Sequence, residues 1–293
     1  MSIQSAKATR TAITLALMLV LIASTSAVAT RYAAERVSVA VIVTVQFTIC
    51  MLLCLPITLR SGIANLHTGR LGLHLFRGAV GVLGFYLFYA ALEQIPMMEA
   101  MLLRQSAPLA VPLVMWAWNG DRVPITAWIP LVTGFIGVSV ILRPSPDGFS
   151  WWYAAGFISA LALAISMVAT HKLATTEPGS RILFYYFVLS LLCVAPFSIW
   201  DFSAISWDVW LAMLYVGISM YYSLRLYTHA YSIAPASAIA PINYFSVLLA
   251  GFWGWLIWEQ VPDGWTLLGS ALVICGGLLT IYLARDRAPT AEP

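Results

Sequence analysis

The chain has 293 residues, of which 61% are hydrophobic and only 9% are charged, and its formal net charge is +3. Soluble domains contain roughly 25% charged residues, so this composition excludes a water-soluble protein and indicates a membrane protein with many spans. The small net charge gives no indication of a nucleic-acid partner.

Runs of about 20 apolar residues, the length that crosses a bilayer, recur along the whole chain. Short polar or turn-forming pieces such as RSGIANLHTGR and RPSPDG separate them. We therefore expect an all-α integral membrane protein with ten helices, at 11–29, 38–59, 71–92, 97–118, 124–142, 151–171, 181–200, 207–231, 235–257 and 265–284.

The first run also has features of a secretory signal, because a basic segment precedes it and Ala27-Val28-Ala29 resembles a cleavage site. Nine further spans follow it, and the internal repeat described below requires a first helix. Both observations favour a permanent transmembrane helix.

Lysine and arginine are unequally divided between the connecting segments. With a cytoplasmic N-terminus, the outer segments hold only Arg31, Arg36 and Arg143. The cytoplasmic segments then hold Lys7, Arg10, Arg60, Arg70, Arg122, Lys172, Arg181, Arg285 and Arg287. The positive-inside rule therefore predicts that both termini are cytoplasmic.

The two halves of the chain align with each other at an offset of about 139 residues, which places Pro96 on Pro235. Further on, Asp121 aligns with Glu259 and Pro124 with Pro262. Five spans per copy is an odd number, so the two copies must cross the membrane in opposite directions. Inverted repeats of this kind build secondary transporters, whose substrate site lies between the halves near the midplane.

The segments that align also resemble a known family. ALEQIPMMEAMLL with GDRVPITAWIPLVTGFIGVSVIL, and AYSIAPASAIAPINY with WEQVPDGWTLLGSALVICGGLLTIYL, are similar to the two EamA repeats of the drug/metabolite transporter superfamily. The resemblance implies ten helices, cytoplasmic termini and a central cavity lined mainly by helices 1, 3, 4, 6, 8 and 9. We expect the first repeat at 11–143 and the second at 151–284.

The third span, LHLFRGAVGVLGFYLFYAAL, resembles one particular subgroup of this family. It is similar to a subgroup associated with uptake of S-adenosylmethionine-like metabolites. That subgroup grades into exporters of amino acids and of metallophores derived from them. One departure between the copies matters, because the first has Arg104 where the second has Asn243.

Arg104 lies about eight residues inside its span, where an arginine costs about 2.5–3.5 kcal/mol on insertion scales. Either a hydrated cavity with an anionic ligand or a structural ion pair can offset that cost. Glu99 is five residues away, about 140° around a helix, a spacing that disfavours a direct pair with Arg104. Arg77 is close enough to the cytoplasmic edge to reach lipid phosphates, which leaves its role open.

A polar stripe runs along the eighth span at helical spacing. It consists of Tyr215, Ser219, Tyr222, Arg225 and His229. The stripe faces either a cavity or a neighbouring helix in a hydrogen-bonded seam. Tyr86, Tyr222 and Tyr244 lie deep enough for their hydroxyls to need partners, and with Asn243 and Glu99 they complete the candidate substrate site. Trp118 and Trp258 are assigned to interfacial belts.

Three glycines and two prolines are candidates for moving contacts. Gly78, Gly81 and Gly84 form a small-residue strip on the third span, which favours close approach of another helix. Pro96 and Pro235 occupy equivalent turns of the two copies.

Other classes of function find little support. The chain has no G-x-S-x-G, H-E-x-x-H or Walker A motif, and its four histidines are scattered. Its four cysteines all lie in apolar runs, which is typical of small buried side chains. From the missing motifs, the scattered histidines and these cysteines we expect no enzyme activity, no cofactor and no metal site. A channel or a structural membrane subunit remains an alternative.

The sequence therefore predicts a secondary transporter of the bacterial inner membrane, surrounded by lipid. Two arginines with tyrosines and an amide favour a small anionic or zwitterionic metabolite, such as an amino acid or an amino-acid-derived, opine-type metallophore. The direction of transport is not visible in the residues, and the family resemblance implies export. The alternative is uptake of an S-adenosylmethionine-like metabolite. Proton coupling and oligomeric state are left open.

Overall fold

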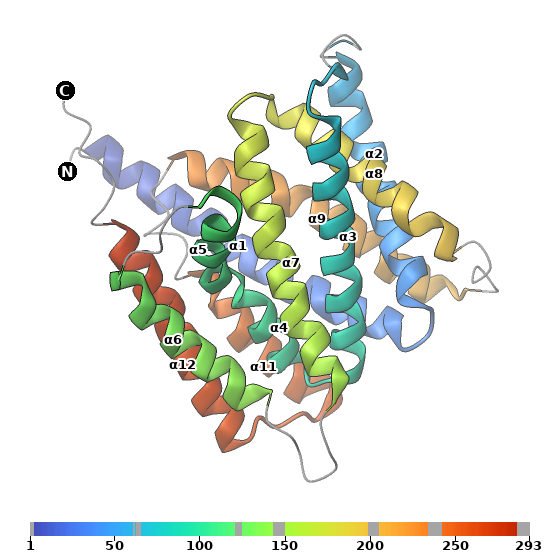
Figure 1. Ribbon diagram of the computed structural model, residues 1–293. Helices are drawn as coiled ribbons and strands as arrows, with labels where there is room; N and C mark the ends of the chain where they lie inside the picture. Colours follow the sequence, from blue (N-terminus) through green and yellow to red (C-terminus); the bar gives the residue numbers. More distant parts are fainter. Residues whose placement is uncertain are drawn as a thin grey trace.

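The computed structural model describes residues 3–60, 62, 66–120, 125–142, 150–198, 205–233 and 242–285, and these contain α-helices and no strand. The helices are α1 (Ile3–Ala34), α2 (Val39–Arg60), α3 (Leu71–Gln94), α4 (Met97–Gln105), α5 (Ala107–Asn119), α6 (Ile125–Ile141), α7 (Trp151–Ala174), α8 (Gly179–Ser198), α9 (Trp207–Ile233), α11 (Phe245–Trp258) and α12 (Gly264–Arg285) (Figure 1). By length and composition, seven spans are long and apolar enough to cross a membrane, and three shorter apolar helices accompany them. Together they match the ten expected spans, which confirms the all-α membrane fold.

Two of the expected spans differ from the observed helices. The first continues to Ala34, so Arg31 belongs to a helix and not to an outer connecting segment. The fourth consists of α4 and α5, which meet at Ser106. Pro108 causes this break, because it has no N–H to donate to the carbonyl of Arg104.

Several of the expected features fall outside the described residues. They are the turn residues Asp121, Arg122 and Pro124, the segment 143–149 with Arg143, and the turn with Pro235.

The closest helix pairs connect the two halves in a symmetric pattern. Spans 1 and 8 (α1 and α9) pack together, and so do spans 3 and 6 (α3 and α7), which are their counterparts in the repeat. Spans 2 and 7 (α2 and α8), 4 and 9 (α4 and α11) and 5 and 10 (α6 and α12) pair with their own counterparts. This is the contact pattern of two inverted five-helix repeats.

Glycines set how closely several of these pairs approach. A Cβ added at Gly137 would lie 2.7 Å from the backbone nitrogen of Val273, and one at Gly276 would lie 2.7 Å from the backbone nitrogen of Gly134. Such close backbone contact explains why α6 and α12 lie side by side along their lengths (Figure 1). Only glycine permits this approach.

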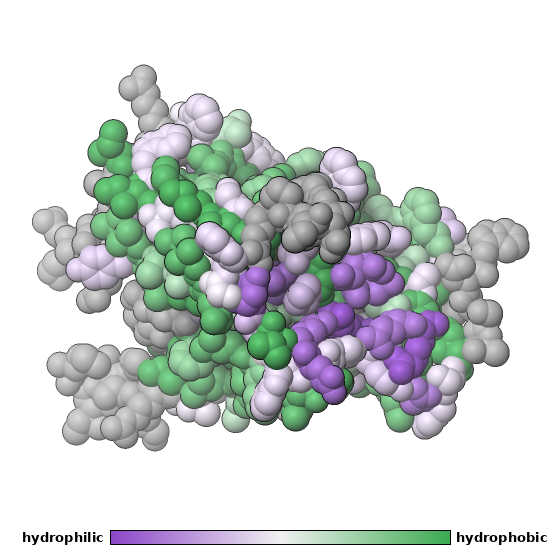
Figure 2. All heavy atoms as spheres, turned by 90° about the horizontal axis from the view of Figure 1, so that it is seen from below, coloured by the Kyte–Doolittle hydropathy of each residue, from purple (hydrophilic) through white to green (hydrophobic). Residues whose placement is uncertain are grey.

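Large apolar side chains cover much of the surface. Ile129 on α6 is 65% exposed and Leu192 on α8 is also 65% exposed, and many others on the outward faces of the helices exceed one third. Figure 2 shows one face from below, where hydrophilic residues gather in one area and apolar residues cover much of the other coloured surface. A surface this apolar requires lipid around it, as expected for a multi-pass membrane protein.

Candidate substrate site

Arg104 lies directly before the break between α4 and α5 and faces α3. Its guanidinium carbon is 4.5 Å from the ring centre of Phe85 and 4.6 Å from that of Phe88. One terminal nitrogen donates a long hydrogen bond of 3.4 Å to the carbonyl of Gly84. None of the acidic residues in the described part of the chain forms an ion pair with it. The arginine is half-buried and has aromatic contacts but no countercharge among those residues.

The equivalent point of the second repeat lies close to this break. The side-chain amide of Gln105 donates to the carbonyl of Asn243 at 3.0 Å and to the hydroxyl of Ser246 at 3.4 Å. Arg104 and Asn243 are counterparts in the alignment of the repeats, so the two copies meet here. Transporters commonly build substrate sites from interrupted helices at such a repeat interface.

A group of buried polar residues surrounds Arg104 on α2, α3 and α8. Tyr89 donates to the side-chain oxygen of Gln46, whose amide group lies 2.6 Å from the sulfur of Met220. Tyr89 and Tyr186 both lie near the guanidinium of Arg104. The sequence analysis did not assign Gln46, Tyr89 and Tyr186 to the site, although a glutamine inside an apolar run is a detectable signal.

Arg77 lies on the other side of Tyr186 and is 7% exposed. Its guanidinium carbon is 4.0 Å from the Tyr186 ring centre, and its Nε donates to the hydroxyl of Thr170 at 2.6 Å. The side chain therefore points into the bundle, where it binds α7 and α8, and not toward lipid phosphates.

The predicted polar stripe of α9 is divided between two environments. The hydroxyl of Tyr215 bonds that of Thr25 at 2.6 Å, and Ser219 donates to Ser26 at 2.9 Å, so these two residues form a seam with α1. Tyr222 is 49% exposed, and Arg225 is also exposed. Contacts between these exposed residues and Arg104 are absent from the described part of the chain.

The remaining predicted residues are dispersed. Tyr86 is 39% exposed on α3. Tyr244 is buried, it packs against Gly277, and its hydroxyl has no partner among the described residues. Through Gln105, the residue next to Arg104, α4 contacts the Asn243 region, whereas Tyr86, Tyr222 and Arg225 are exposed.

Hydrogen bonds join the two halves at one end of the bundle. We call this the outer end, since the charge distribution predicts that it faces outward; it holds the turns at 35–38, 95–96 and 259–263. Tyr32 donates to Asp208 at 2.5 Å, Trp258 donates to Glu35 at 2.6 Å, and the Met97 backbone N–H donates to Gln260 at 3.0 Å. Arg31 reinforces this end by donating to the carbonyls of Leu92 and Ile95, at 2.9 and 2.7 Å.

The opposite, inner end contains a buried cluster around Glu177, in the turn between α7 and α8. His74 Nε2 is 2.7 Å from one carboxylate oxygen, Thr68 donates to the other, and Arg181 is 3.8 Å away. Burial alone would raise the pKa of Glu177. The hydrogen bonds from Thr68 and His74, together with the charges of His74 and Arg181, outweigh it, so the pKa is lowered.

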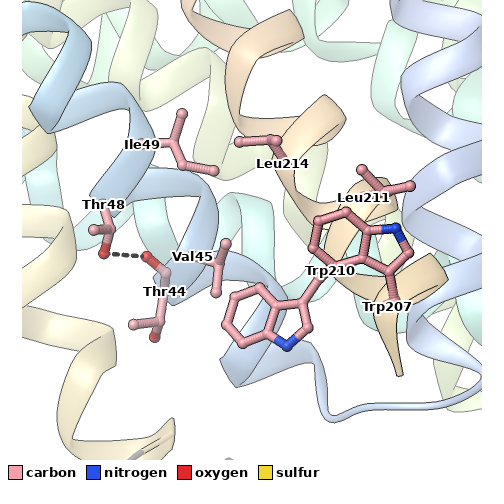
Figure 3. A pocket seen from close by; sticks show the side chains of 8 residues that line it. All are labelled: Thr44, Val45, Thr48, Ile49, Trp207, Trp210, Leu211 and Leu214. Atoms are coloured by element: carbon pink, nitrogen blue, oxygen red, sulfur yellow. Dashed lines mark hydrogen bonds between the residues drawn. The ribbon is translucent and has the colours of Figure 1, made fainter. Parts of the chain in front are cut away.

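A separate apolar groove of about 470 Å³ lies between α2 and α9 (Figure 3). Its lining includes Trp207, Trp210 and Leu214 from α9 and Ile49 from α2. The hydroxyl of Thr48 points to the backbone carbonyl of Thr44 at 2.8 Å, so it is already occupied (Figure 3). None of the predicted site residues lines this groove, and its lining contains no charged side chain to bind an anionic metabolite.

Comparison with known proteins agrees with the fold. The model of the EamA-like transporter family matches residues 10–143 and 150–282. The chain is 28% identical over 202 residues to the pseudopaline exporter CntI of Pseudomonas aeruginosa, covering 68% of this chain and 71% of the relative. It is 28% identical to a riboflavin transporter of Vibrio cholerae, covering 78% of each, and 23% identical to an S-adenosylmethionine uptake transporter of Rickettsia bellii, covering 81% of each.

A solved crystal structure superimposes with a TM-score of 0.61 at 21% identity, over 94% of this chain and 98% of the other. At that identity the likeness supports the fold alone. The family model, in contrast, matches both repeats and almost the whole chain. The chain therefore belongs to the EamA-like transporter family of the drug/metabolite transporter superfamily.

Proposed function

We propose that this membrane transporter exports a small anionic or zwitterionic metabolite whose carboxylate binds Arg104. The class of substrate that fits is an amino acid, or an opine-type metallophore derived from one. The family and the named relatives establish a transporter of small molecules, and the substrate and the direction are the proposal.

The environment of Arg104 carries this proposal. A guanidinium inside a membrane bundle needs an anion, water or a carbonyl to offset its loss of hydration. Here it has two aromatic faces and one long bond to a carbonyl, which leaves most of its five N–H donors for a ligand. A carboxylate can take two of these donors in parallel, an arrangement that discriminates against neutral molecules.

The break at Ser106 supports placing the substrate at this point. At this point Gln105, the neighbour of Arg104 in the chain, donates to the Asn243 carbonyl of the second repeat, so we expect a ligand here to contact both halves. We propose that the two halves, 11–143 and 151–284, move relative to each other around it, with both termini in the cytoplasm. Asn243, Tyr244, Tyr86, Tyr222, Arg225 and Glu99 stay predicted contributors to the pathway.

The direction of export is supported by the likeness to a protein named as a pseudopaline exporter. Uptake of an S-adenosylmethionine-like cation is the second candidate, since one relative carries that name. The Phe85 and Phe88 rings are surfaces that would attract a sulfonium. Arg104 already occupies both of these faces, which favours the anionic substrate.

Efflux from proteoliposomes tests the proposal with no single substrate chosen in advance. Vesicles loaded with a bacterial small-molecule extract are prepared with the parent protein, the Arg104→Leu variant or no protein, and the released compounds are identified by mass spectrometry. We expect the parent to release a small set of carboxylate-bearing metabolites that the variant retains. Equal release by both proteins, or release only of compounds without a carboxylate, would contradict the proposal.

A further inference from the structure

Glu99 is a carboxylate buried inside the membrane bundle that ties the two halves together at the outer end. It lies in the first turn of α4 and is 8% exposed. Its Oε2 accepts a hydrogen bond from the hydroxyl of Tyr153 at 2.5 Å, and its Oε1 accepts one from Thr266 at 2.6 Å. Tyr153 is in the first turn of α7 and Thr266 in that of α12, so both donors belong to the second half.

No cation balances this carboxylate among the described residues. Arg104, on the same span, faces α3, and Arg31 of α1 is bound to carbonyls at the end of α3. The turn before α12 contributes Glu259, Gln260 and Asp263, of which Asp263 caps the Thr266 backbone N–H. The hollow beside Glu99 is lined by the amide of Gln260, the hydroxyl of Thr266 and apolar residues.

A hollow of about 20 Å³ adjoins Glu99, lined by Pro96, Gly251, Gly254, Gln260 and Thr266 among others. A cavity needs roughly 10–15 Å³ of this measure to hold one water molecule. The hollow lies beside the turns of the outer end, so one water molecule there would bring the carboxylate within proton-exchange distance of that end.

We propose that Glu99 is a proton-binding site that controls opening of the outer end, an inference that rests on the proposed movement of the two halves. An ionised carboxylate is acceptor-only, so both hydroxyls can donate to it at once. Hydrogen bonds to an ionised group are roughly twice as strong as those between neutral groups. A proton taken from the outer water therefore weakens both cross-half bonds, and the outer end opens.

Intramembrane carboxylates that face the bundle interior commonly serve as proton relays, whereas structural acids are usually paired with a base. Glu99 is buried, as a proton-relay carboxylate is, and within the described residues it has no basic partner of the kind that a structural acid has. Two hydroxyl donors from different helices also give its charge state a direct mechanical consequence, because each bond connects α4 to the opposite half.

Hydrogen–deuterium exchange on the full-length protein in lipid nanodiscs tests the inference without a substrate. Glu99→Gln keeps the shape of the side chain and removes its charge. At pH 7.5 we expect backbone amides in 96–105 and 264–270 to exchange roughly tenfold faster in this variant than in the parent. Glu93→Gln is the matched control, since Glu93 also lies near the outer end but bonds Gln94 of its own half.

The parent provides the second arm of the test. Lowering the pH should raise exchange in the same segments of the parent toward the level of Glu99→Gln, which itself serves as the reference for the chemical effect of pH. Equal exchange in parent and variant at pH 7.5 would overturn the proposal. It would also be overturned if the variant kept the full pH response of the parent.

Two further variants separate this inference from a general loss of folding and from the role of Arg104. Thr266→Val removes one donor and leaves the carboxylate in place, so it should loosen the outer end at neutral pH while the inner-end amides keep their parental exchange. Arg104→Leu should leave the pH response intact. If substrate release fails to depend on Arg104 but Glu99 responds as stated, only the proposed substrate is wrong.

Discussion

Arg31 allows a sharp test of how the outer end is held together. Its guanidinium donates to the carbonyls of Leu92 and Ile95, at 2.9 and 2.7 Å, and lies 5.1 Å from the ring centre of Trp258. Hydrogen bonds from a charged donor contribute about 1.5–3 kcal/mol each, so two of them amount to about 3–6 kcal/mol. Removing a buried charge recovers part of its desolvation cost.

We therefore expect Arg31→Met, which keeps most of the volume and loses every donor, to destabilise the protein by about 2–4 kcal/mol. The measurement is equilibrium unfolding in mixed micelles with increasing dodecyl sulfate, followed by tryptophan fluorescence. Arg36→Met is the matched control, because Arg36 is 40% exposed and its bonds to Glu35 and to the Tyr32 carbonyl lie at the surface, so its loss should cost only about 1 kcal/mol. Equal stability of the two variants would refute the reasoning.

Other parts of the molecule allow three more tests. Because the pKa of Glu177 is lowered, its ionised form contributes stability at neutral pH that is lost as the pH falls through that pKa. Thermal scans should therefore show Glu177→Gln below the parent at pH 7, and a difference that persists unchanged below about pH 4 would contradict this. A Cβ at Gly81 would lie 2.5 Å from the Tyr186 ring, so Gly81→Leu should slow vesicle efflux while protein yield and insertion stay normal. The control is Gly72→Leu, because nothing lies within 4 Å of a Cβ there, and it should leave efflux and yield at parental values. Unchanged efflux in Gly81→Leu would exclude a moving contact at this glycine. Reporter fusions should place both termini in the cytoplasm and 143–150 outside, and an external N-terminus would overturn the charge-based orientation.

Hydropathy and the repeat predicted the ten spans and their division into two inverted copies, but not the extension of α1 to Ala34 or the break at Ser106. A bilayer allows few alternatives to a helix of about 20 apolar residues, so the spans follow from composition. The alignment of the copies at equivalent prolines implied an inverted repeat, and the symmetric pairing of helices across the halves agrees with it. The charge of Arg104 inside an apolar run was also visible in the sequence.

What the sequence could not provide are the partners supplied by distant segments. Arg31 lies just after the first apolar run, so the sequence places it in a connecting segment. Its acceptors, at the end of α3, are more than 60 residues away and cannot be identified from the local sequence. The Glu99 carboxylate accepts hydrogen bonds from hydroxyls 54 and 167 residues away, and no local sequence pattern predicts these partners. The stripe on α9 has helical spacing, but the spacing does not say that its first half meets serine and threonine hydroxyls of α1.

The proposed function depends above all on Arg104 binding the carboxylate of the transported metabolite, and equilibrium binding is the decisive measurement. The compound identified by efflux is titrated by calorimetry into detergent-purified parent, Arg104→Lys and Arg104→Leu proteins, after far-ultraviolet circular dichroism shows that all three are folded. We predict that Arg104→Leu loses measurable binding. Arg104→Lys, which keeps the charge but not the two parallel donors, should bind about tenfold to a hundredfold more weakly than the parent. Equal affinity in the parent and Arg104→Leu would contradict this role and leave Arg104 as a structural residue packed between Phe85 and Phe88.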